Sequence, residues 1–445
     1  MDGYSQETLR RIDGNDDTLV ELGISRNNHI LSRDGRYFTS TDGGDYSKLG
    51  SYIGRNTQLE TLFVELRDIR LSVSDSGFFE GIKLNSSINK FRLSGYNEQY
   101  GSFTPVGEVG CALLNALHEN NSNITTLHIW SCNIGNVGVC MIINTTLGSC
   151  TNLKIISLTN NGITDELLLP MVEAIRGHSS LHELILWENR IDNAGCEALA
   201  TLLQDPNCNI HTLNIHGNHI RNEGAIAIAN SLVSNTKLKE LNLRDNQIGN
   251  EGAIAIANSL ANNTKLKELI ISDNQMDNQN IVQDAFSRVL CNTSSINAIY
   301  SSNHTLANLF GGYEEEERMG DPLVSLLRLN EKTNKSHAAI KKILKYYPKI
   351  DMTQLFEWGT GDERNIMALP YVIDWFGRAK EAVEHVDEND RQSKMLRDYV
   401  RQREGYTTKE RKLTAIYEFA LAMPLLFIPN SHAKAEDKKR KRKNE

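Results

Sequence analysis

The feature that most constrains the fold is a sequence segment that the chain contains twice. The first copy, NEGAIAIANSLVSNTKLKEL, spans residues 222–241, and the second, NEGAIAIANSLANNTKLKEL, spans residues 250–269. The copies differ only at Val233/Ala261 and Ser234/Asn262. Such self-similarity at a fixed period indicates a tandem repeat, in which each unit packs mainly on its neighbours.

Each copy belongs to a longer unit that combines a short strand with a helix. The strand half follows the pattern L-x-x-L-x-L-x-x-N-x-I, which begins at Leu238 and recurs in variant form at Leu266. Alternating Leu241 and Leu243 predict a strand whose apolar side faces a core. The helical half has Asn250 as a predicted N-cap, followed by apolar residues at helical spacing: Ala253, Ile256, Ala257 and Leu260. One strand and one helix cannot bury their apolar sides alone, so the units must stack.

An asparagine closes the strand half of most units. In five successive units it is Asn161, Asn189, Asn218, Asn246 and Asn274. We predict that its amide bonds the backbone of the adjoining turn, because each backbone group left unpaired there would cost roughly 1–3 kcal/mol. The same position holds Cys132 in the preceding unit and is predicted to be His304 in the last unit.

This unit resembles the leucine-rich repeat, and its length and helical half are similar to the ribonuclease-inhibitor-like subtype. Similar repeats occur in the Ran GTPase-activating protein and in nucleotide-binding immune receptors. The resemblance implies an α/β fold, a curved solenoid with a parallel inner sheet and outer helices. Strand motifs are predicted to begin at Leu59, Ile88, Ile124, Leu153, Leu181, Ile210, Leu238, Leu266 and Ile296.

The spacing of these motifs predicts the N-terminal organisation of the chain. Residues 1–58 are expected to form an irregular first repeat and cap, in which a strand motif begins at Leu19 and residues 46–53 form a short helix. Residues 59–312 are expected to form the solenoid. Motif spacings are nearly constant from Ile124 onward, whereas the wider and less regular spacings upstream indicate insertions.

The period is absent from the C-terminal part of the chain. Residues 313–430 are therefore predicted to form a separate all-α domain, with helices that begin at Asp321 and Ser336. The second of these helices is expected to point Lys341, Lys342 and Lys345 outward. Residues 431–445 are predicted to be a basic disordered tail. Two more helices are predicted, after Pro370 and after Thr407.

The resemblance places the side chains between the inward leucines on the concave face. Six residues after the first residue of each motif, from the motif at Ile124 to that at Leu266, one column contains Trp130, Thr159, Trp187, His216, Arg244 and Ser272. Two residues after the first residue, a second column contains Thr126, Ile155, Glu183, Thr212, Glu240 and Glu268. Just before the asparagine stand Ser131, Asn160, Glu188, Gly217, Asp245 and Asp273. The predicted partner-binding residues are Trp130, Trp187, His216, Arg244, Glu183, Glu240, Glu268, Asp245 and Asp273, because tryptophans are enriched among interface anchors. The alternatives are that the tryptophans are covered or tolerated and that the acidic band is a solvated face.

The sequence does not predict catalysis. The motifs G-x-x-x-x-G-K-[ST], G-x-S-x-G and H-E-x-x-H are absent from it. His182 and His211 share one column, but neither a carboxylate nor a cysteine completes a metal shell, so we predict neither a metal nor a cofactor. Seven cysteines without framework spacing, an N-terminus without an apolar core and the lack of a membrane-length apolar run predict a reduced protein of the cytosol or nucleus.

Charge is distributed unevenly along the chain. The net charge is -8, and residues 434–445 contribute +4, which leaves -12 for the rest. This C-terminal segment contains a cluster of six basic residues: Lys438, Lys439, Arg440, Lys441, Arg442 and Lys443. Such a cluster is typical of a nuclear-import signal or a nucleic-acid patch. The acidic remainder does not favour nucleic-acid binding. A further hypothesis is that this tail binds the acidic concave face and competes with a partner.

These observations favour a non-enzymatic scaffold that binds another protein, with a basic surface, on its concave face. The alternative that the resemblance implies is a regulator of a small GTPase, similar to the Ran GTPase-activating protein. That family carries an acidic C-terminal tail, whereas this chain ends in basic residues. No membrane partner is predicted.

Overall fold

The computed structural model describes residues 6–25, 38–39, 46–66, 71–95, 107–120, 123–132, 151–176, 178–309, 321–331 and 335–346. The chain divides into two compact units. The first consists of Met1–Leu290 and Asn303–Lys332, and the second of Cys291–Ser302 and Thr333–Glu445. The domain boundaries expected from the sequence stay predictions.

The first unit is built around one parallel sheet. Its strands are β1 (Glu21–Ser25), β2 (Phe38–Thr39), β3 (Thr61–Glu65), β4 (Lys90–Ser94), β5 (Thr126–Trp130), β6 (Ile155–Ser157), β7 (Glu183–Ile185), β8 (Thr212–Asn214), β9 (Glu240–Asn242) and β10 (Glu268–Ile270). Their order is β10-β9-β8-β7-β6-β5-β4-β3-β1-β2, so from β3 onward each strand lies beside the next one in sequence. Leu241 stands opposite Leu269 in this ladder. The predicted parallel solenoid is therefore confirmed.

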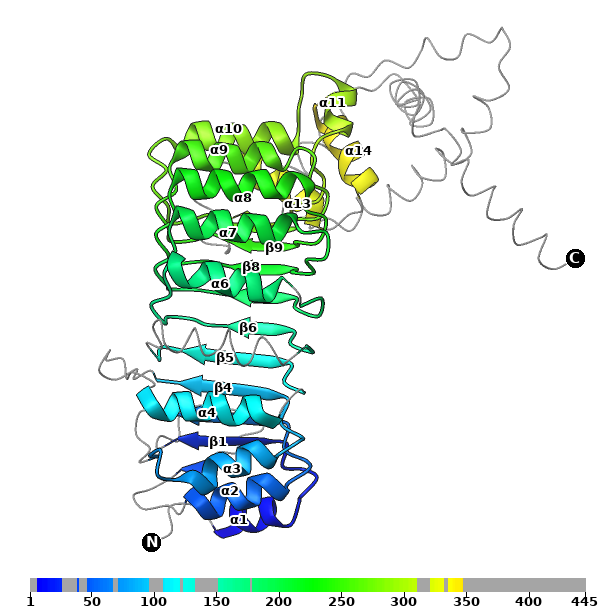
Figure 1. The fold of residues 1–445 in the computed structure, drawn as a ribbon. Helices are drawn as coiled ribbons and strands as arrows, with labels where there is room; N and C mark the ends of the chain where they lie inside the picture. Colours follow the sequence, from blue (N-terminus) through cyan, green and yellow to red (C-terminus); the bar gives the residue numbers. More distant parts are fainter. Residues whose placement is uncertain are drawn as a thin grey trace, which may run out of the picture. The chain divides into compact units, whose positions relative to one another are not determined.

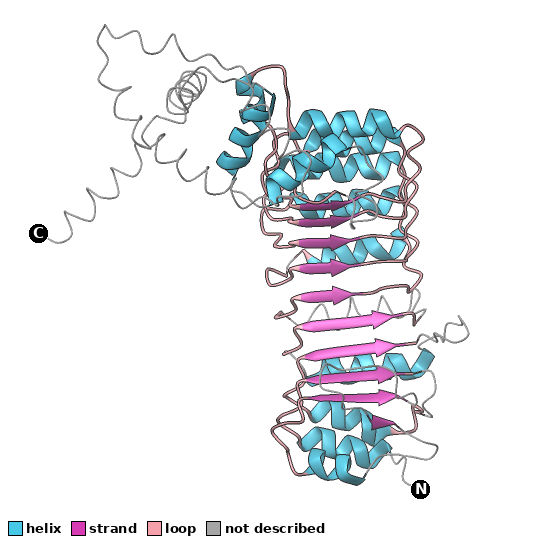
Figure 2. Cartoon of the chain, turned by 180° about the vertical axis from the view of Figure 1, so that it is seen from behind, coloured by secondary structure: helices cyan, strands magenta, loops and turns pink. Residues whose placement is uncertain are grey.

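The helices form a second layer on one side of the sheet (Figure 1), and the view from behind shows the strands on the other side (Figure 2). The described helices of the first unit are α1 (Gln6–Asp13), α2 (Tyr46–Arg55), α3 (Ser76–Leu84), α4 (Gly107–Asn120), α6 (Asp165–Ile175), α7 (Asn193–Gln204), α8 (Asn222–Ser234), α9 (Asn250–Ser259), α10 (Gln279–Leu290) and α13 (Asp321–Glu331). The core lies between the layers: Leu213 and Leu241 of the strands and Ile228 and Ile256 of the helices are all buried. Burial of these apolar side chains against neighbouring units stabilises the stack.

The N-terminal segment joins the same sheet. Leu19 and Ile24 are buried, and β1 pairs with β3 so that Glu21 stands opposite Thr61. This register makes Leu19 equivalent to Leu59. The sequence reasoning missed helix α1, which precedes this strand.

The strand motif predicted at Ile296 is wrong. Residues Ile296–Tyr300 form helix α11 in the second unit. The sheet instead continues at Asn308, which forms a parallel bridge with Glu268 and accepts a hydrogen bond of 2.9 Å from the Leu269 N–H. This register makes Leu306 the equivalent of Leu266. His304 therefore lies before the strand motif and not at the asparagine position.

The predicted asparagine position lies in a ladder of buried hydrogen bonds. The Nδ2 of Asn246 donates to the carbonyl oxygens of Ile215, Leu243 and Arg244 at 3.1, 3.0 and 3.1 Å, and its Oδ1 accepts from the Ile220 N–H at 3.1 Å. Similar bonds surround Asn161, Asn189, Asn218 and Asn274. Each amide thus ties its own turn to the preceding repeat.

Cys132 occupies the equivalent place in the repeat of β5. Its side chain is fully buried, and its Sγ lies 3.3 Å from the Trp130 carbonyl oxygen and 3.8 Å from that of Leu93. Burial raises the pKa of the thiol to about 12, so the sulfur stays protonated and can donate to these carbonyls. A thiol therefore replaces part of the amide's bonding.

A second asparagine ladder lies at the other end of the strands and was missed by the sequence reasoning. Asn263 Oδ1 accepts from the N–H groups of Lys265 and Leu266, and its Nδ2 donates to the Leu232 carbonyl oxygen at 2.8 Å. Comparable bonds are made by Asn56, Asn85, Asn235 and Asn303. The available signal was an asparagine three residues before several of the strand motifs, as at Asn56, Asn85, Asn235, Asn263 and Asn303.

Helix capping also passes between repeats. The prediction that Asn250 caps its own helix is wrong, because Gly249 is the N-cap residue and makes no side-chain bond there. Asn222, the equivalent residue one repeat earlier, accepts from the N–H groups of Gly249 and Gly252 at 2.8 and 3.1 Å. Each such side chain thus caps the next helix along the stack. A Cβ at position 252 would lie 3.0 Å from Asn222 Oδ1, which favours glycine there.

In the second unit the described residues are 291–302 and 335–346, which include α11 and α14 (Lys335–Tyr346) packed together. The prediction that Lys342 points outward is wrong, because its side chain is fully buried. It follows the buried Ala338 and Ala339 by four and three residues and so shares their helix face. Burial lowers the pKa of Lys342 to about 7. The helices predicted after Pro370 and Thr407 and the cluster Lys438–Lys443 lie outside the described residues.

Candidate functional site

The candidate site is the sheet face opposite the helices, here called the open face. In β5, Leu127 and Ile129 are buried in the core, so the alternating residues Thr126, His128 and Trp130 belong to the open face. The same alternation assigns the equivalent residues of the later strands to the open face. Figure 2 shows this face toward the viewer. Trp130 lies in β5, whereas Trp187, His216 and Arg244 each lie two residues beyond the ends of the short strands β7, β8 and β9.

The C-terminal half of the open face carries a connected row of side chains. The rings of Trp187 and His216 stack with centroids 5.4 Å apart and an interplanar angle of 14°. His216 Nε2 lies 3.8 Å from Asp245 Oδ2, and Arg244 Nη2 lies 2.7 Å from Asp273 Oδ2. Trp187 remains 38% exposed despite the stacking. The row therefore presents a flat aromatic surface beside paired charges.

The charge on this row depends on pH. Burial lowers the pKa of His216, and the neighbouring Arg244 lowers it as well, whereas Asp245 acts in the opposite direction. The imidazole is therefore neutral at pH 7, and its contact with Asp245 becomes an ion pair only when the pH falls. At neutral pH this part of the open face is acidic and aromatic.

Trp130 lies apart from Trp187, with Thr159 at the equivalent position between them. Its ring stacks on Phe63 of β3, with centroids 5.5 Å apart and an interplanar angle of 7°. Trp130 is half-buried and Phe63 is buried, so this pair offers less apolar surface than Trp187 does. The structure thus gives each predicted tryptophan a different aromatic partner and does not bring the two together.

The predicted glutamates line the start of the strands. Glu183, Thr212, Glu240 and Glu268 stand in register across β7 to β10. Glu240 accepts from Thr212 Oγ1 at 3.1 Å, and Glu268 accepts from Asn308 Nδ2 at 3.3 Å. Burial raises the pKa of Glu268, and the adjacent Glu240 raises it further. Two neighbouring carboxylates therefore create a local negative potential that a cationic group would neutralise.

The third predicted column occupies a strained turn. Five residues of this column have positive φ angles of 51 to 54°: Ser131, Asn160, Glu188, Asp245 and Asp273. Gly217, in the same column, has a φ of 65°. Asparagine, aspartate and glycine adopt this left-handed conformation most readily, whereas a glutamate does so at a cost. Glu188 is thus held in an unfavourable backbone conformation next to the exposed Trp187.

Glycine at position 188 should raise the free energy of unfolding by about 0.5–1 kcal/mol, because relief of the left-handed strain exceeds the added entropy of the unfolded chain. Glu240→Gly is the matched control, since Glu240 is an exposed glutamate in the extended strand β9 and should lose stability instead. Urea unfolding measures both. A loss of stability in Glu188→Gly would show that the turn is not strained.

The sequence reasoning missed the column four residues into each motif. It contains His128, Ser157, Ile185, Asn214, Asn242 and Ile270. Asn214 Oδ1 accepts from the His216 N–H at 3.1 Å, and Asn242 Oδ1 accepts from the Arg244 N–H at 3.0 Å. Burial lowers the pKa of His128 to about 4. The same spacing rule that found the other columns could have found this one.

Neither a metal site nor a membrane span is seen in the described part of the chain. The rings of His182 and His211 do meet, with centroids 5.0 Å apart, yet within the described residues no three His, Cys, Asp or Glu side chains gather as metal ligands. None of the described helices combines the length and apolar character needed to cross a membrane.

Comparison with known proteins identifies the repeats. A family model described as "Leucine Rich repeat" matches residues 120–142, 149–166, 177–200, 207–229, 234–257 and 262–279. Ribonuclease inhibitor of Mus musculus is 32% identical over 108 residues, which is 24% of this chain and 24% of that protein. RAN GTPase-activating protein 2 of Arabidopsis thaliana is 25% identical over 107 residues, 24% of this chain and 20% of that protein. NACHT, LRR and PYD domains-containing protein 13 of Homo sapiens is 27% identical over 124 residues, 28% of this chain and 12% of that protein. The matched segments thus span at most about a quarter of these relatives.

Proposed function

Because residues 120–279 are leucine-rich repeats similar to those of ribonuclease inhibitor, we propose that this protein is a non-enzymatic scaffold that binds a partner protein on its open face. The observation that carries the proposal is the exposed Trp187 stacked on His216 beside the Arg244–Asp273 pair. Large aromatic and arginine side chains dominate the energy of protein interfaces.

The charges around Trp187 define the kind of partner. Glu188, Asp245 and Asp273 are exposed around the stacked rings, and Glu240 and Glu268 form a second acidic spot on the same face. Arg244 pairs with one of these carboxylates, that of Asp273. We therefore expect a partner that presents a lysine- or arginine-bearing surface with an apolar group for Trp187, since opposite potentials favour association.

Alanine at position 187 should weaken binding of this partner by about thirtyfold, because removal of a central aromatic anchor typically costs about 2 kcal/mol. Quantitative affinity purification with the full chain, followed by titration of each recovered protein, measures the effect. Leu169→Ala is the matched control, because Leu169 is 57% exposed on helix α6 in the other layer. Equal recovery of partners by Trp187→Ala, or selective loss with Leu169→Ala, would place the interface elsewhere.

The similarity to a Ran GTPase-activating protein supports one alternative, in which the partner is a small GTPase and this chain regulates it. The two interpretations differ in what happens to bound GTP. Single-turnover GTP hydrolysis by a Ran-type GTPase, with and without this protein, distinguishes them. Faster hydrolysis supports the regulator, whereas binding with unchanged hydrolysis supports the scaffold.

A further inference from the structure

A second surface lies along the edge where the strands begin, separate from the row around Trp187. The residue one position into each motif stands in a continuous backbone ladder there. The N–H of His182 donates to the Lys154 carbonyl oxygen at 2.9 Å, and the same link joins His211 to His182, Lys239 to His211 and Lys267 to Lys239 at 2.7, 2.8 and 2.8 Å. We call these five residues the basic rim. Their common register fixes the spacing of the side chains.

The basic rim places ionisable nitrogen groups in five consecutive repeats. Lys154, Lys239 and Lys267 are exposed, and His182 and His211 are half-exposed. Neighbouring strands are about 4.8 Å apart, so the five positions extend over about 19 Å. Lys237 and Lys265, each two residues earlier, add positive charge beside the C-terminal end of the rim. The four lysines at this end, Lys237, Lys239, Lys265 and Lys267, gather like charges, which costs stability unless an opposite charge lies against them.

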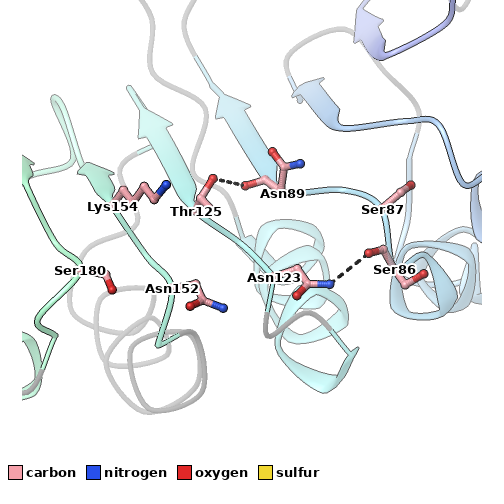
Figure 3. A pocket seen from close by; sticks show the side chains of 8 residues that line it. All are labelled: Ser86, Ser87, Asn89, Asn123, Thr125, Asn152, Lys154 and Ser180. Carbon is pink, nitrogen blue, oxygen red and sulfur yellow. Dashed lines mark hydrogen bonds between the residues drawn. The ribbon is translucent and has the colours of Figure 1, made fainter. Parts of the chain in front are cut away.

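A polar groove continues the basic rim toward β4. It has a volume of about 490 Å³ and is lined by Ser86, Ser87, Asn89, Asn123, Thr125, Asn152, Lys154 and Ser180. Figure 3 shows these side chains on the turns that lead into successive strands. The described lining residues supply hydroxyl, amide and ammonium groups and no carboxylate. Lys154 belongs to both the groove and the basic rim, so the two surfaces are continuous.

We propose that the groove and the basic rim together bind an extended acidic segment of a partner protein. The hydroxyls of Ser87 and Thr125 already donate to backbone carbonyl oxygens, so their oxygens are left to accept from peptide N–H groups. The lysines can pair with aspartate or glutamate side chains. The groove and the basic rim together reach from β4 to β10, which is about 29 Å at about 4.8 Å per strand, and an extended chain of about nine residues spans that length. A single-stranded nucleic acid is disfavoured because its binding sites use aromatic stacking, and the described groove lining contains no aromatic residue.

Protonation of His211 should make the affinity for an acidic segment depend on pH. Burial lowers the pKa of His211, and Lys239, His182 and Lys237 lower it further. The next position along the neighbouring strands carries the carboxylates of Glu183 and Glu240. The His211 imidazole is therefore uncharged at pH 7.5 and becomes cationic only as the pH falls below about 6.5. Because an acidic segment binds the charged form, affinity should rise as the pH falls.

Fluorescence anisotropy with the full chain tests the proposal. The probe is a labelled peptide of alternating glutamate and serine residues, and the same peptide with glutamine replacing glutamate is its control. Lys239→Gln/Lys267→Gln should weaken binding of the acidic peptide about tenfold at 0.1 M salt. Lys83→Gln on helix α3 removes one charge from the helical layer and should change nothing. His211→Gln should reduce the rise in affinity between pH 7.5 and 5.5.

Several outcomes would overturn the proposal: equal binding of the glutamine peptide, unchanged binding by the lysine variants, or tighter binding of an oligothymidine than of the acidic peptide. Trp187→Ala should leave peptide binding unchanged, because Trp187 lies outside the groove and the basic rim. The outcome at the rim is thus independent of the outcome at the open face.

Discussion

Alanine in place of Asn246 should lower the free energy of unfolding by about 4 kcal/mol, because each buried polar group left unpaired costs roughly 1–3 kcal/mol. The substitution removes three bonds from Nδ2 to backbone carbonyl oxygens and one bond from the Ile220 N–H to Oδ1. Asn246 is buried, so water cannot replace these bonds freely. Urea unfolding of the full chain, followed by circular dichroism, measures the loss.

Two further variants make this prediction specific. Gln247→Ala is the control, because the bonds of Gln247 to Arg221 and His219 are long and exposed. Their loss should cost at most about 0.5 kcal/mol, as is usual for surface substitutions. Asn246→Cys should be less destabilising than Asn246→Ala, because Cys132 already bonds two carbonyl oxygens from the equivalent place. A cost for Asn246→Ala no larger than that of Gln247→Ala would show that the ladder contributes little to stability.

The periodicity of the sequence predicted the fold because each repeat contacts mainly its neighbours. Alternation within L-x-L places Leu241 and Leu269 in the core, and the fixed period makes them neighbours in the sheet. The last repeat was misplaced because Ile296 satisfies an apolar pattern at nearly the right spacing. The true start at Leu306 lies well beyond one period from Leu266 and is recognised only through Asn303, whose bonds the pattern did not include.

Contacts between repeats were the part that sequence reasoning could not supply. A pattern within one unit suggested that Asn250 caps its own helix, whereas the equivalent Asn222 caps the helix of the next unit. The tertiary environment also determines the burial of the Lys342 side chain. It lies on a buried helix face, although its neighbours in sequence predicted an exposed position. Such side chains are directed by packing and not by their own chemical type.

The candidate site was predicted as a set of columns and not as a set of contacts. Strand alternation suffices to place Trp187, Arg244 and Glu240 on the open face. The stack of Trp187 on His216 depends on side-chain torsions in two repeats, which no spacing rule gives. The basic rim was overlooked because two of its lysines, Lys239 and Lys267, are directly followed by a glutamate in the sequence. Only the register separates the two signs of charge into two columns. Partner binding by either surface remains a proposal.

Alanine in place of Gly81 should lower the free energy of unfolding by about 3 kcal/mol, at the upper end of the usual cost of overpacking. Helices α2 and α3 approach each other through glycines, and a Cβ at position 81 would lie 1.9 Å from the Gly50 carbonyl oxygen and 2.5 Å from its Cα. Backbone atoms cannot rotate away, so the helices must separate. In an unpacked helix the same substitution would stabilise by about 1 kcal/mol, so packing reverses the sign.

Other positions on the same two helices provide a graded test of this contact. A Cβ on Gly54 would lie 3.1 Å from the Gly81 carbonyl oxygen, which requires only a small shift, so Gly54→Ala should cost less than Gly81→Ala. Glu80 lies on the exposed side of α3. Glu80→Ala should therefore change stability by at most about 0.5 kcal/mol, as is usual for surface substitutions. Thermal and urea unfolding rank the three variants. A stabilised Gly81→Ala protein would mean that α2 and α3 do not pack through their glycines, because the helix propensity of alanine would then be the only remaining effect.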